Sequence, residues 1–413
     1  MIRDILHSNF CGKNDKLGKW YQDQLAKLDF PIYCSFDIRD AGFKISNVDA
    51  NIFPAGFNNI CPTDKETSVS LFDQYLNRTY GSKNKKILLV TEEHTNNAFY
   101  WENVATIKQL IEESGRSVMV GIPRDIAEPI KVQSATGKEI TVYSGFETSC
   151  SIGEFHPDLI ISNNDFSEAH SEWASTVTIP INPPRELGWY QRKKSRYFKW
   201  FNKVSSEFCD MAGIDPFTMN VRTEVFEDFQ IVDESSVKML AEKVDTMIAE
   251  LSVEYQKRNI DAKPFVFVKN NSGTYGLAVI RVGSGQEVLT WNYKSRKKMK
   301  AAKGGRTVEE VIIQEGIPSV VKAEGVTAEP VIYMVGCELA GGFLRTHAEK
   351  DSTESLNSPG AVYKKLCVSD LQTAMQGAQL ENVYGWSARL GLLAIAYEAK
   401  DMGIEFKGTV TKV

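Results

Sequence analysis

The sequence lacks the cysteine pattern of a secreted or zinc-binding protein. Its seven cysteines are scattered, odd in number and free of any CxxC pair, which favours free thiols in a reducing compartment over a disulfide framework or a zinc site. No window approaches the roughly 20 apolar residues of a membrane helix, and the first residues, which include Arg3 and Asp4, contain no apolar core of signal-peptide length. We therefore expect a cytoplasmic protein without a membrane partner.

An excess of positive charge is also missing. The formal net charge is -5, which gives no electrostatic reason to expect a nucleic-acid partner, and the lysine cluster KSRKKMK is more typical of a solvated face or a mobile loop. Internal repeats and low-complexity tracts are absent as well. What is present is a chain of 413 residues, 42% hydrophobic, which is enough for two or three domains with a sizeable core. Whether it forms a homo-oligomer is left open.

Residues 85–122 follow the pattern of a βαβ unit. The run KKILLV predicts a buried strand, the segment 98–115 predicts an amphipathic helix ended by Gly115, and SVMVGIP predicts a second strand. Ligands collect at the carboxyl ends of parallel strands, so the turn before the helix could hold a small polar substrate. Helix capping by Thr95 or Asn96 is the alternative use of this turn. Its polar residues are Glu92, Glu93, His94, Thr95, Asn96 and Asn97. The run DLIISNNDFS repeats the pattern and strengthens the case for a cleft.

Two further segments contain charged side chains among aromatic residues. After a predicted strand at 32–36, the chain continues as a polar loop that either binds a ligand or is braced by side-chain hydrogen bonds. A helix that follows PPRELG has a cationic face, which either holds a carboxylate or phosphate or covers an aromatic stripe. The polar residues of the loop are Asp37, Arg39, Lys44, Asp49, Asn51, Asn58 and Asn59; those of the helix include Arg192, Lys194, Ser195 and Arg196.

The run PFVFVKNNSGTYG combines a strand, a cation and glycines. The apolar residues 266–268 predict a buried strand that ends at Lys269. Gly273 and Gly276 allow main-chain N–H groups to approach phosphate oxygens, while Lys269 supplies a mobile positive charge. By itself this run is more typical of an ordinary β-hairpin with a surface lysine.

The order of the features after Lys269 resembles that of the ATP-grasp ligases, and glutathione synthetase in particular. A short strand runs into a hinge at 314–318, the hairpin VIYMVGCELAGGFLRT turns at Gly336 and ends near Arg345, and an acidic loop follows. Over nearly the whole chain, the strings FDIRDAGFKISNVDANIFPAGFNN, TEEHTNNAFYWEN, GWYQRKKS, FVKNNSGTYG and ESLNSPGAVYKKL resemble the proteobacterial glutamate-cysteine ligase family of the ATP-grasp fold.

This resemblance implies the first step of glutathione synthesis. L-Glutamate, L-cysteine and ATP would give γ-glutamylcysteine, ADP and phosphate through an acyl phosphate, with Mg²⁺ present. Arg345 would be the catalytic residue, neutralising charge on the transferring phosphoryl group. The expected ATP-binding residues are Arg222, Lys269, Ser272, Gly273, Gly276, Gln314, Glu315 and Ile317. The expected substrate-binding residues are Arg39, Lys44, Asn51, Asn59, Glu93, Asn96 and Arg192.

The residues expected to bind Mg²⁺ match the pattern of glutathione synthetase less closely than the phosphate-binding residues do. The likeness points to Glu354 and Asn357 as Mg²⁺ ligands, with Glu338 or Asp351 as further candidates. However, this chain has Glu-x-x-Asn where glutathione synthetase has Glu-x-Asn, and it is expected to end in two helices. Cys337 and Cys367 lie in apolar stretches and are expected to serve packing.

Together these features predict an α/β protein in which an N-terminal parallel-sheet (pre-ATP-grasp) domain is followed by an ATP-grasp fold of two α+β subdomains. The expected divisions are an N-terminal substrate domain at 1–200, a lid subdomain at 201–312 and a C-terminal subdomain at 313–413. Two alternatives remain: an ATP-grasp carboxylate-amine ligase with another acceptor, and a nucleotide-binding protein without turnover.

Overall fold

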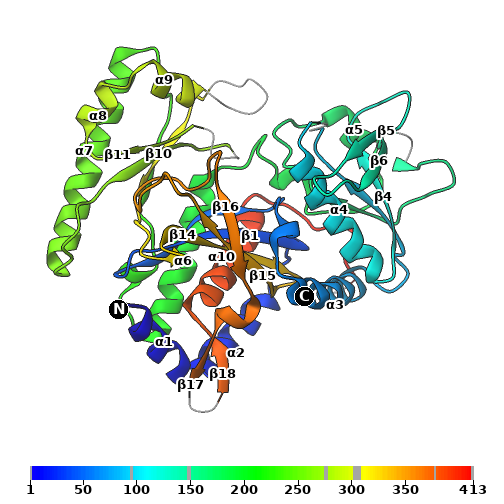
Figure 1. Cartoon of the computed structure of the whole chain (residues 1–413), viewed down its shortest axis with the longest axis horizontal. Helices are drawn as coiled ribbons and strands as arrows, with labels where there is room; N and C mark the ends of the chain where they lie inside the picture. The colour runs from blue at the N-terminus through cyan, green and yellow to red at the C-terminus, as the bar shows by residue number, and fades with distance from the viewer. Residues whose placement is uncertain are drawn as a thin grey trace.

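The computed structural model of the chain describes residues 2–93, 96–146, 150–273, 278–300, 308–375 and 378–410. These residues form a mixed α/β fold with several sheets, as expected (Figure 1). No helix within the described ranges is long and apolar enough to cross a membrane.

The predicted βαβ unit is confirmed within a six-stranded sheet of order β5-β6-β4-β3-β7-β8. Strand β3 pairs in parallel with β4 and β7, while β5 and β6 form an antiparallel hairpin. Both faces of β3 are buried, which explains its continuous apolar run. The strands are β3 (Lys86–Val90), β4 (Ser117–Ile122), β5 (Ile130–Gln133), β6 (Glu139–Ser144), β7 (Leu159–Ser162) and β8 (Ile181–Asn182), and the helices are α3 (Pro62–Tyr80), α4 (Ala98–Glu113) and α5 (Ser171–Thr176).

A second sheet, the central sheet, is antiparallel and has the order β16-β15-β14-β1-β2, with β13 paired to β14. The hairpin about Gly336 is confirmed, and this glycine has a positive φ of 59°. The strands are β1 (Tyr33–Asp40), β2 (Ile45–Asn51), β13 (Lys322–Ala323), β14 (Val326–Val335), β15 (Glu338–Thr346) and β16 (Val362–Leu366).

The polar loop expected after residue 36 is wrong, because this segment is the buried hairpin of β1 and β2. Phe36 and Ile38 enter the hydrophobic core, while Asp37 and Arg39 point to the opposite face. Their charges pair with charges on other strands, so a polar sequence can lie inside the molecule.

The third sheet, the small sheet, has the order β11-β10-β12-β9 and confirms the predicted strands around Lys269 and Gln314. The predicted long helix before it is α7. The strands are β9 (Thr223–Phe226), β10 (Val266–Asn270), β11 (Val279–Val282) and β12 (Val311–Glu315), and the helices are α7 (Glu234–Lys257), α8 (Gly285–Leu289) and α9 (Tyr293–Lys300).

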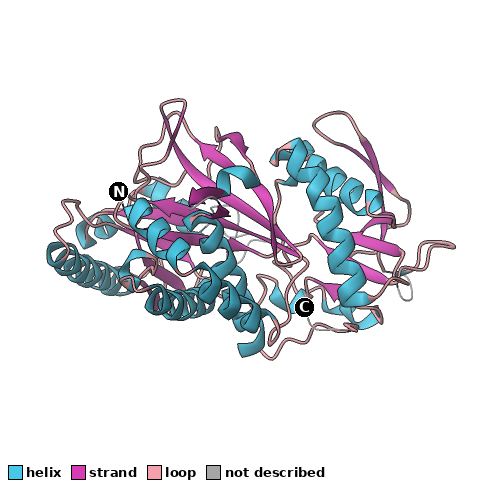
Figure 2. Ribbon diagram, turned by 90° about the horizontal axis from the view of Figure 1, so that it is seen from below, coloured by secondary structure: helices cyan, strands magenta, loops and turns pink. Residues whose placement is uncertain are grey.

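Helices from both ends of the sequence cover the core side of the central sheet. Helix α10 crosses that face so closely that a Cβ on Gly391 would lie 2.5 Å from the Phe36 ring. From below, the central strands lie between these helices and the parallel-sheet region (Figure 2). The helices are α1 (Ile2–Gly12), α2 (Asn14–Leu25), α6 (Lys194–Ala212) and α10 (Val383–Asp401). The expected pair of C-terminal helices is wrong: the hairpin β17 (Gln372–Met375) and β18 (Ala378–Glu381) precedes a single helix.

The sheets cross the expected domain divisions. Strands β1 and β2 belong to the segment 1–200, yet β1 pairs with β14 of the segment 313–413. Strand β12 continues across the expected division after residue 312. Strand pairing between distant segments therefore joins the first and last parts of the chain.

A buried ion pair joins α10 to the segment before α6. Arg192 Nη2 lies 2.9 Å from Glu398 Oε2, its Nε donates to both carboxylate oxygens, and its Nη1 donates to the Ala50 carbonyl at 3.0 Å. Arg192 was expected to bind substrate, but its guanidinium is 1% exposed and is held by these protein acceptors.

Arg192→Met should lower the free energy of unfolding by about 3–5 kcal/mol, because it leaves Glu398 buried without its partner. Chemical denaturation measures the change. Arg196→Met is the matched control, since the Arg196–Asp401 pair is partly exposed at 3.7 Å and should contribute at most about 1 kcal/mol. Arg192→Met combined with Glu398→Gln should recover part of the loss. Equal losses of unfolding free energy in Arg192→Met and Arg196→Met would show that the buried Arg192–Glu398 pair is not a main anchor of the fold.

Candidate functional site

A pocket lies between the central sheet and the small sheet. Strands β1, β2 and β14 line one side, β10, β11 and β12 line the other, and the start of α6 and the β15–β16 loop (347–361) complete it. Its lining residues are Asp37, Arg39, Val48, Asp49, Lys194, Phe267, Lys269, Gly273, Val279, Glu315, Ile317, Glu329, Ser355 and Asn357.

Strand register brings four charged side chains onto one face of the central sheet. Asp37 and Arg39 are two residues apart on β1 and therefore point the same way. Glu329 of β14 lies directly opposite Arg345 of β15. Asp37 pairs with Val331, which is two residues from Glu329 and shares its face. We call these four residues, Asp37, Arg39, Glu329 and Arg345, the charged face.

The charges of this face neutralise one another. Arg345 Nη1 donates to Asp37 Oδ2 at 2.6 Å and to Glu329 Oε1 at 2.8 Å. Arg39 Nε pairs with the other oxygen of Glu329, and its Nη groups donate to carbonyls of the β15–β16 loop at 3.1 and 2.8 Å. The four side chains are only 3% to 7% exposed. The same contacts therefore position the carboxylates and hold the loop.

The two carboxylates of this face differ in how well they are stabilised. Burial opposes the ionisation of Glu329, but Arg39 and Arg345 outweigh it, so the pKa of Glu329 is lowered. Burial dominates at Asp37 and raises its pKa despite Arg345. Burial also opposes the charge of Arg345, but the two carboxylates hold its pKa above the usual value. Asp37 is therefore the carboxylate of this face that would gain most from a further cation.

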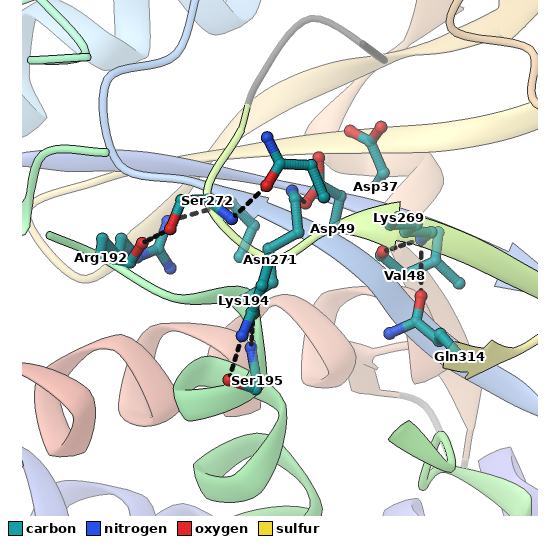
Figure 3. A network of polar contacts seen from close by, with 12 residues as sticks. Asp37, Val48, Asp49, Arg192, Lys194, Ser195, Lys269, Asn271, Ser272 and Gln314 are labelled. Atoms are coloured by element: carbon teal, nitrogen blue, oxygen red, sulfur yellow. Dashed lines mark hydrogen bonds and ion pairs between the residues drawn. The ribbon is translucent and has the colours of Figure 1, made fainter. Parts of the chain in front are cut away.

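Lys269 enters the pocket from the small sheet. Its ammonium donates to the Val48 carbonyl at 3.1 Å and to Gln314 Oε1 at 2.6 Å (Figure 3). Neither partner carries a charge. Burial lowers the pKa of Lys269 to about 8, although the charge of Asp49 opposes the shift. An anionic ligand would stabilise the charge on this ammonium.

The carboxylate of Asp49 lies near Lys269 in the pocket. Lys194, at the start of α6, donates to Asp49 Oδ1 at 2.5 Å. Burial opposes the ionisation of Asp49, but Lys194 and Lys269 outweigh it and lower its pKa. The charged part of the pocket therefore contains both cations and carboxylates.

The other part of the pocket is apolar. Val48, Phe267, Val279 and Ile317 all line it, and Phe267 and Ile317 are themselves largely buried. Glu315 also lines it, but Lys44 donates to both of its carboxylate oxygens at 2.6 and 2.8 Å. A flat apolar group and an anion could therefore occupy adjoining parts of one site.

The structure brings several of the predicted residues together. Lys269, Gly273, Glu315, Ile317, Arg39 and Asn357 line the pocket. Gln314 holds Lys269, Arg345 lies behind Asp37 and Glu329, and Ser272 closes the turn by donating to the Arg192 carbonyl at 3.0 Å. The carbonyl of Glu354 accepts from Arg39, whereas its carboxylate accepts from Lys350 at 2.7 Å.

Other predicted residues do not line this pocket, and their charges are engaged by protein partners. Arg222 pairs with Glu224 and Glu250 on a partly exposed surface. Lys44 is buried against Glu315, which makes it an anchor for the hinge after β12. The two alternative metal ligands are also engaged, because Glu338 pairs with Arg389 and Asp351 accepts from Thr353.

The remaining predicted residues that the structure describes are not among those that line the pocket. Asn51 is opposite Ser35 on β1 and therefore shares the face of Asp49, and Asn59 accepts from Asn58. At the end of β3, Glu93 pairs with Arg124 at 3.0 Å and Asn96 is exposed. Gly276, His94 and Thr95 lie outside the described residues.

The polar ends of β3 and β7 meet at one sheet edge, as expected, but they bind the protein's own chain. Asn103 Oδ1 accepts from the N–H groups of Gly56 and Phe57 at 2.8 and 2.9 Å. Asn163 donates to the Pro54 carbonyl at 2.9 Å, and Asn164 donates to the Thr91 carbonyl at 3.0 Å. Asn103, which lies in α4, and Asn163 therefore brace the loop that follows β2, whereas Asn164 links the ends of β3 and β7.

Sequence analysis named Asp37, Asp49 and Lys194 only as polar residues of a loop and a helix that could bind a ligand, and it did not name Glu329. The alternation in FDIR was an available signal, because a strand with one apolar and one charged face implies charged partners on its neighbours. Glu329 had no such signal, because the predicted strand began after it.

Fold and pocket define an α/β protein with a pocket in which a charged part adjoins an apolar part. The family model for glutamate-cysteine ligase (GshA) matches residues 8–399. A solved structure of a candidate gamma-glutamylcysteine synthetase from Methylobacillus flagellatus KT has a TM-score of 0.86 and 30% sequence identity, covering 96% of each chain. The chain belongs to the glutamate-cysteine ligase family, which confirms the resemblance. It is a ligase that joins glutamate to cysteine, the first step of glutathione biosynthesis.

Two other solved structures are much less similar. A D-alanyl-alanine synthetase A from Vibrio cholerae O1 biovar eltor has a TM-score of 0.33 and 12% identity, covering 77% of this chain and 81% of its own. A glutathione synthetase-like effector from Globodera pallida has a TM-score of 0.37 and 10% identity, covering 88% and 84%. No match was found among curated proteins.

Lys269 should titrate near pH 8, well below the ordinary lysine value of 10.5, because its charged form is buried. NMR of ¹³C-labelled lysine side chains measures this, and Lys269→Arg identifies the signal. Asp49→Asn should lower the Lys269 pKa further, since the Asp49 charge favours the ammonium. A titration near 10.5 would show that the side chain is solvated.

Proposed function

We propose that the pocket binds ATP and Mg²⁺ between two facing antiparallel sheets of an ATP-grasp fold. There the γ-carboxylate of L-glutamate would be phosphorylated and then joined to L-cysteine, giving γ-glutamylcysteine, ADP and phosphate. The observation that carries this proposal is the pocket itself, in which an apolar part adjoins a buried lysine and a set of carboxylates. Within this arrangement, the expected N-terminal substrate domain shares the central sheet with the C-terminal subdomain.

The residues present fit a nucleotide. Phe267, Val279 and Ile317 would pack against the base, and Lys269 would neutralise phosphate oxygens. Gly273, at the start of the turn after β10, lets the main chain approach the phosphates. Gln314 would keep Lys269 directed into the pocket, since its Oε1 accepts from the ammonium. Arg222 has no place in this assignment, because its charge is engaged on the outer side.

The carboxylates of the charged face fit a magnesium ion. Mg²⁺ binds oxygen ligands and is usually shared between one or two carboxylates and the phosphates of the substrate, whose charge it shields. Asp37 and Glu329 line the pocket together with Asn357, and burial raises the pKa of Asp37 despite its contact with Arg345, so a further cation would stabilise its charged form. We therefore assign Asp37, Glu329 and Asn357 as the metal-binding residues in place of Glu354, whose carboxylate is held by Lys350.

The amino-acid substrates would bind along the same face of the central sheet. Asn51 follows Asp49 by two residues on β2, which extends the polar face away from the apolar part. Arg39 lies on the same face further along β1, opposite Ser46, and would supply a cation for a carboxylate. Glu93 and Asn96 lie at the edge of the parallel sheet and are left out of this assignment.

The chemical role of the protein is to position groups and to balance charge. A carboxylate becomes reactive toward an amine only when one of its oxygens becomes a leaving group, which phosphoryl transfer provides. Lys269 and Lys194 would stabilise charge on the transferring group. Arg345 would act as a positioning residue, since it binds Asp37 and Glu329 directly. Its buried Nε has no hydrogen-bond partner among the described residues, which leaves one donor available.

Purified protein given glutamate, cysteine, ATP and Mg²⁺ should form γ-glutamylcysteine and ADP in equal amounts. ADP formation only with an amine other than cysteine would favour a carboxylate-amine ligase with another acceptor. ATP binding without ADP formation would favour a nucleotide-binding protein without turnover.

Lys269→Ala should lower kcat/KM by roughly 10² to 10³, because a preorganised charge at the phosphates is lost. Arg222→Ala should change it little, and thermal melting checks that both variants fold. Near-normal turnover by Lys269→Ala would contradict the assignment of this pocket as the ATP-binding site.

Asp37→Asn should raise the Mg²⁺ concentration needed for half-maximal rate by roughly tenfold or more, since a metal-binding oxygen loses its charge. The measurement is the rate against Mg²⁺ at saturating substrates. Glu338→Gln is the matched control, because Glu338 is half exposed and pairs with Arg389 outside the pocket. An unchanged Mg²⁺ requirement in a folded Asp37→Asn protein would exclude this carboxylate as a ligand.

A further inference from the structure

The fold brings together two cysteines and an aspartate that lie far apart in the sequence. The ligand atoms of Cys61, Asp64 and Cys367 all lie within 4.8 Å of one another. Cys61 directly precedes α3, Asp64 lies in its first turn, and Cys367 follows β16. Cys61 and Asp64 are buried, whereas Cys367 is partly exposed, so solvent can reach the group from one side.

We propose that Cys61, Asp64 and Cys367 form a binding site for a thiophilic divalent cation of the Zn²⁺ type. Two thiolates and a carboxylate oxygen are ligands that Zn²⁺ prefers, and three protein ligands leave a fourth position for water. Sulfur atoms around a tetrahedral Zn²⁺ are roughly 3.8 Å apart, as Zn–S bonds of about 2.3 Å require. Ligand atoms already within 4.8 Å of one another need to move by only about an ångström.

The surrounding main chain leaves room for the carboxylate at this position. A Cβ on Gly341 of β15 would lie 2.8 Å from Asp64 Oδ2, so only a glycine leaves that space open. Gly341 also has a positive φ of 115°, which other residues rarely adopt. The same oxygen accepts from the Val368 N–H at 2.9 Å, which orients the carboxylate beside Cys367. An outer hydrogen bond of this kind is typical of a metal ligand.

The two thiols already interact with each other and with the carboxylate. The Cys61 thiol lies close to the Cys367 thiol and to the Asp64 carboxylate, since the three ligand atoms are within 4.8 Å of one another. This contact, together with burial, raises the pKa of Cys367 to about 12, so the cation would have to displace thiol protons. A disulfide is the other chemistry open to two neighbouring cysteines, but it gives no role to Asp64 or to the space over Gly341. The three groups together favour a cation.

Such a cation would link distant parts of the fold. It would tie the start of α3 to the segment behind β16, at the edge of the central sheet. The site uses none of the residues assigned to catalysis, and it stands whether or not the proposed reaction is correct.

The test uses Co²⁺ as a spectroscopic probe on the reduced, untagged full chain with excess Mg²⁺ present. The expected result is one Co²⁺ per chain with thiolate-to-cobalt charge-transfer absorption and the strong visible bands of a tetrahedral site, both lost when Zn²⁺ is added. Cys61→Ser and Cys367→Ser should each lose the thiolate absorption. Asp64→Asn, which keeps an acceptor for Val368, should bind at least about tenfold more weakly.

Cys11→Ser is the matched control, because Cys11 is a free, partly exposed cysteine outside the group, and its loss should leave the spectrum unchanged. Thermal melting checks that every variant is folded. The proposal is overturned if wild-type protein shows no thiolate–cobalt absorption, if that absorption survives in Cys61→Ser combined with Cys367→Ser, or if two thiols are lost on mild oxidation while Co²⁺ never binds.

Discussion

The mutual neutralisation of Asp37, Arg39, Glu329 and Arg345 is the interaction on which the site depends. Moving one ion out of water costs several kcal/mol, so four charges can lie inside a sheet only if each has partners at hydrogen-bond distance. Two guanidiniums share two carboxylates across β1, β14 and β15, and Arg39 also holds the β15–β16 loop. The same contacts that make burial tolerable direct Asp37 and Glu329 toward the pocket.

The pocket combines two kinds of surface because it lies between two sheets of different character. The small sheet contributes apolar side chains and Lys269, and the central sheet contributes the carboxylates. A phosphate chain needs cations, and the metal that accompanies it needs anions, so both must be present within one cavity without cancelling each other. In the proposed assignment, Lys269, whose hydrogen-bond partners are neutral, would meet the phosphates, and Asp37, whose pKa is raised by burial, would meet the metal. The chain belongs to the glutamate-cysteine ligase family, and we propose that its reaction takes place in this pocket.

Several charged residues outside the pocket are anchors between distant segments. Arg192 binds Glu398, and Lys44 binds Glu315, in each case with little exposure to solvent. Their sequence neighbourhoods resemble those of Arg39 and Lys269, since each is a basic residue with an aromatic residue within a few positions. Whether such a residue faces a ligand or an acid of its own chain depends on its partner, which lies hundreds of positions away. For this reason the sequence alone did not reveal that Arg192 and Lys44 form buried ion pairs.

Local patterns in the sequence determined the apolar strands, the βαβ unit, the long helix α7 and the placement of Lys269 at a strand end, because hydrophobic period and turn residues act over short distances. The family resemblance followed from long strings that include these patterns. Only the tertiary structure decided that β1 and β2 join β14, that Asp37 meets Arg345, and that Cys61 meets Cys367. Those contacts depend on strand register and long-range packing, and a one-residue shift would turn every charged side chain of β1 to the opposite face.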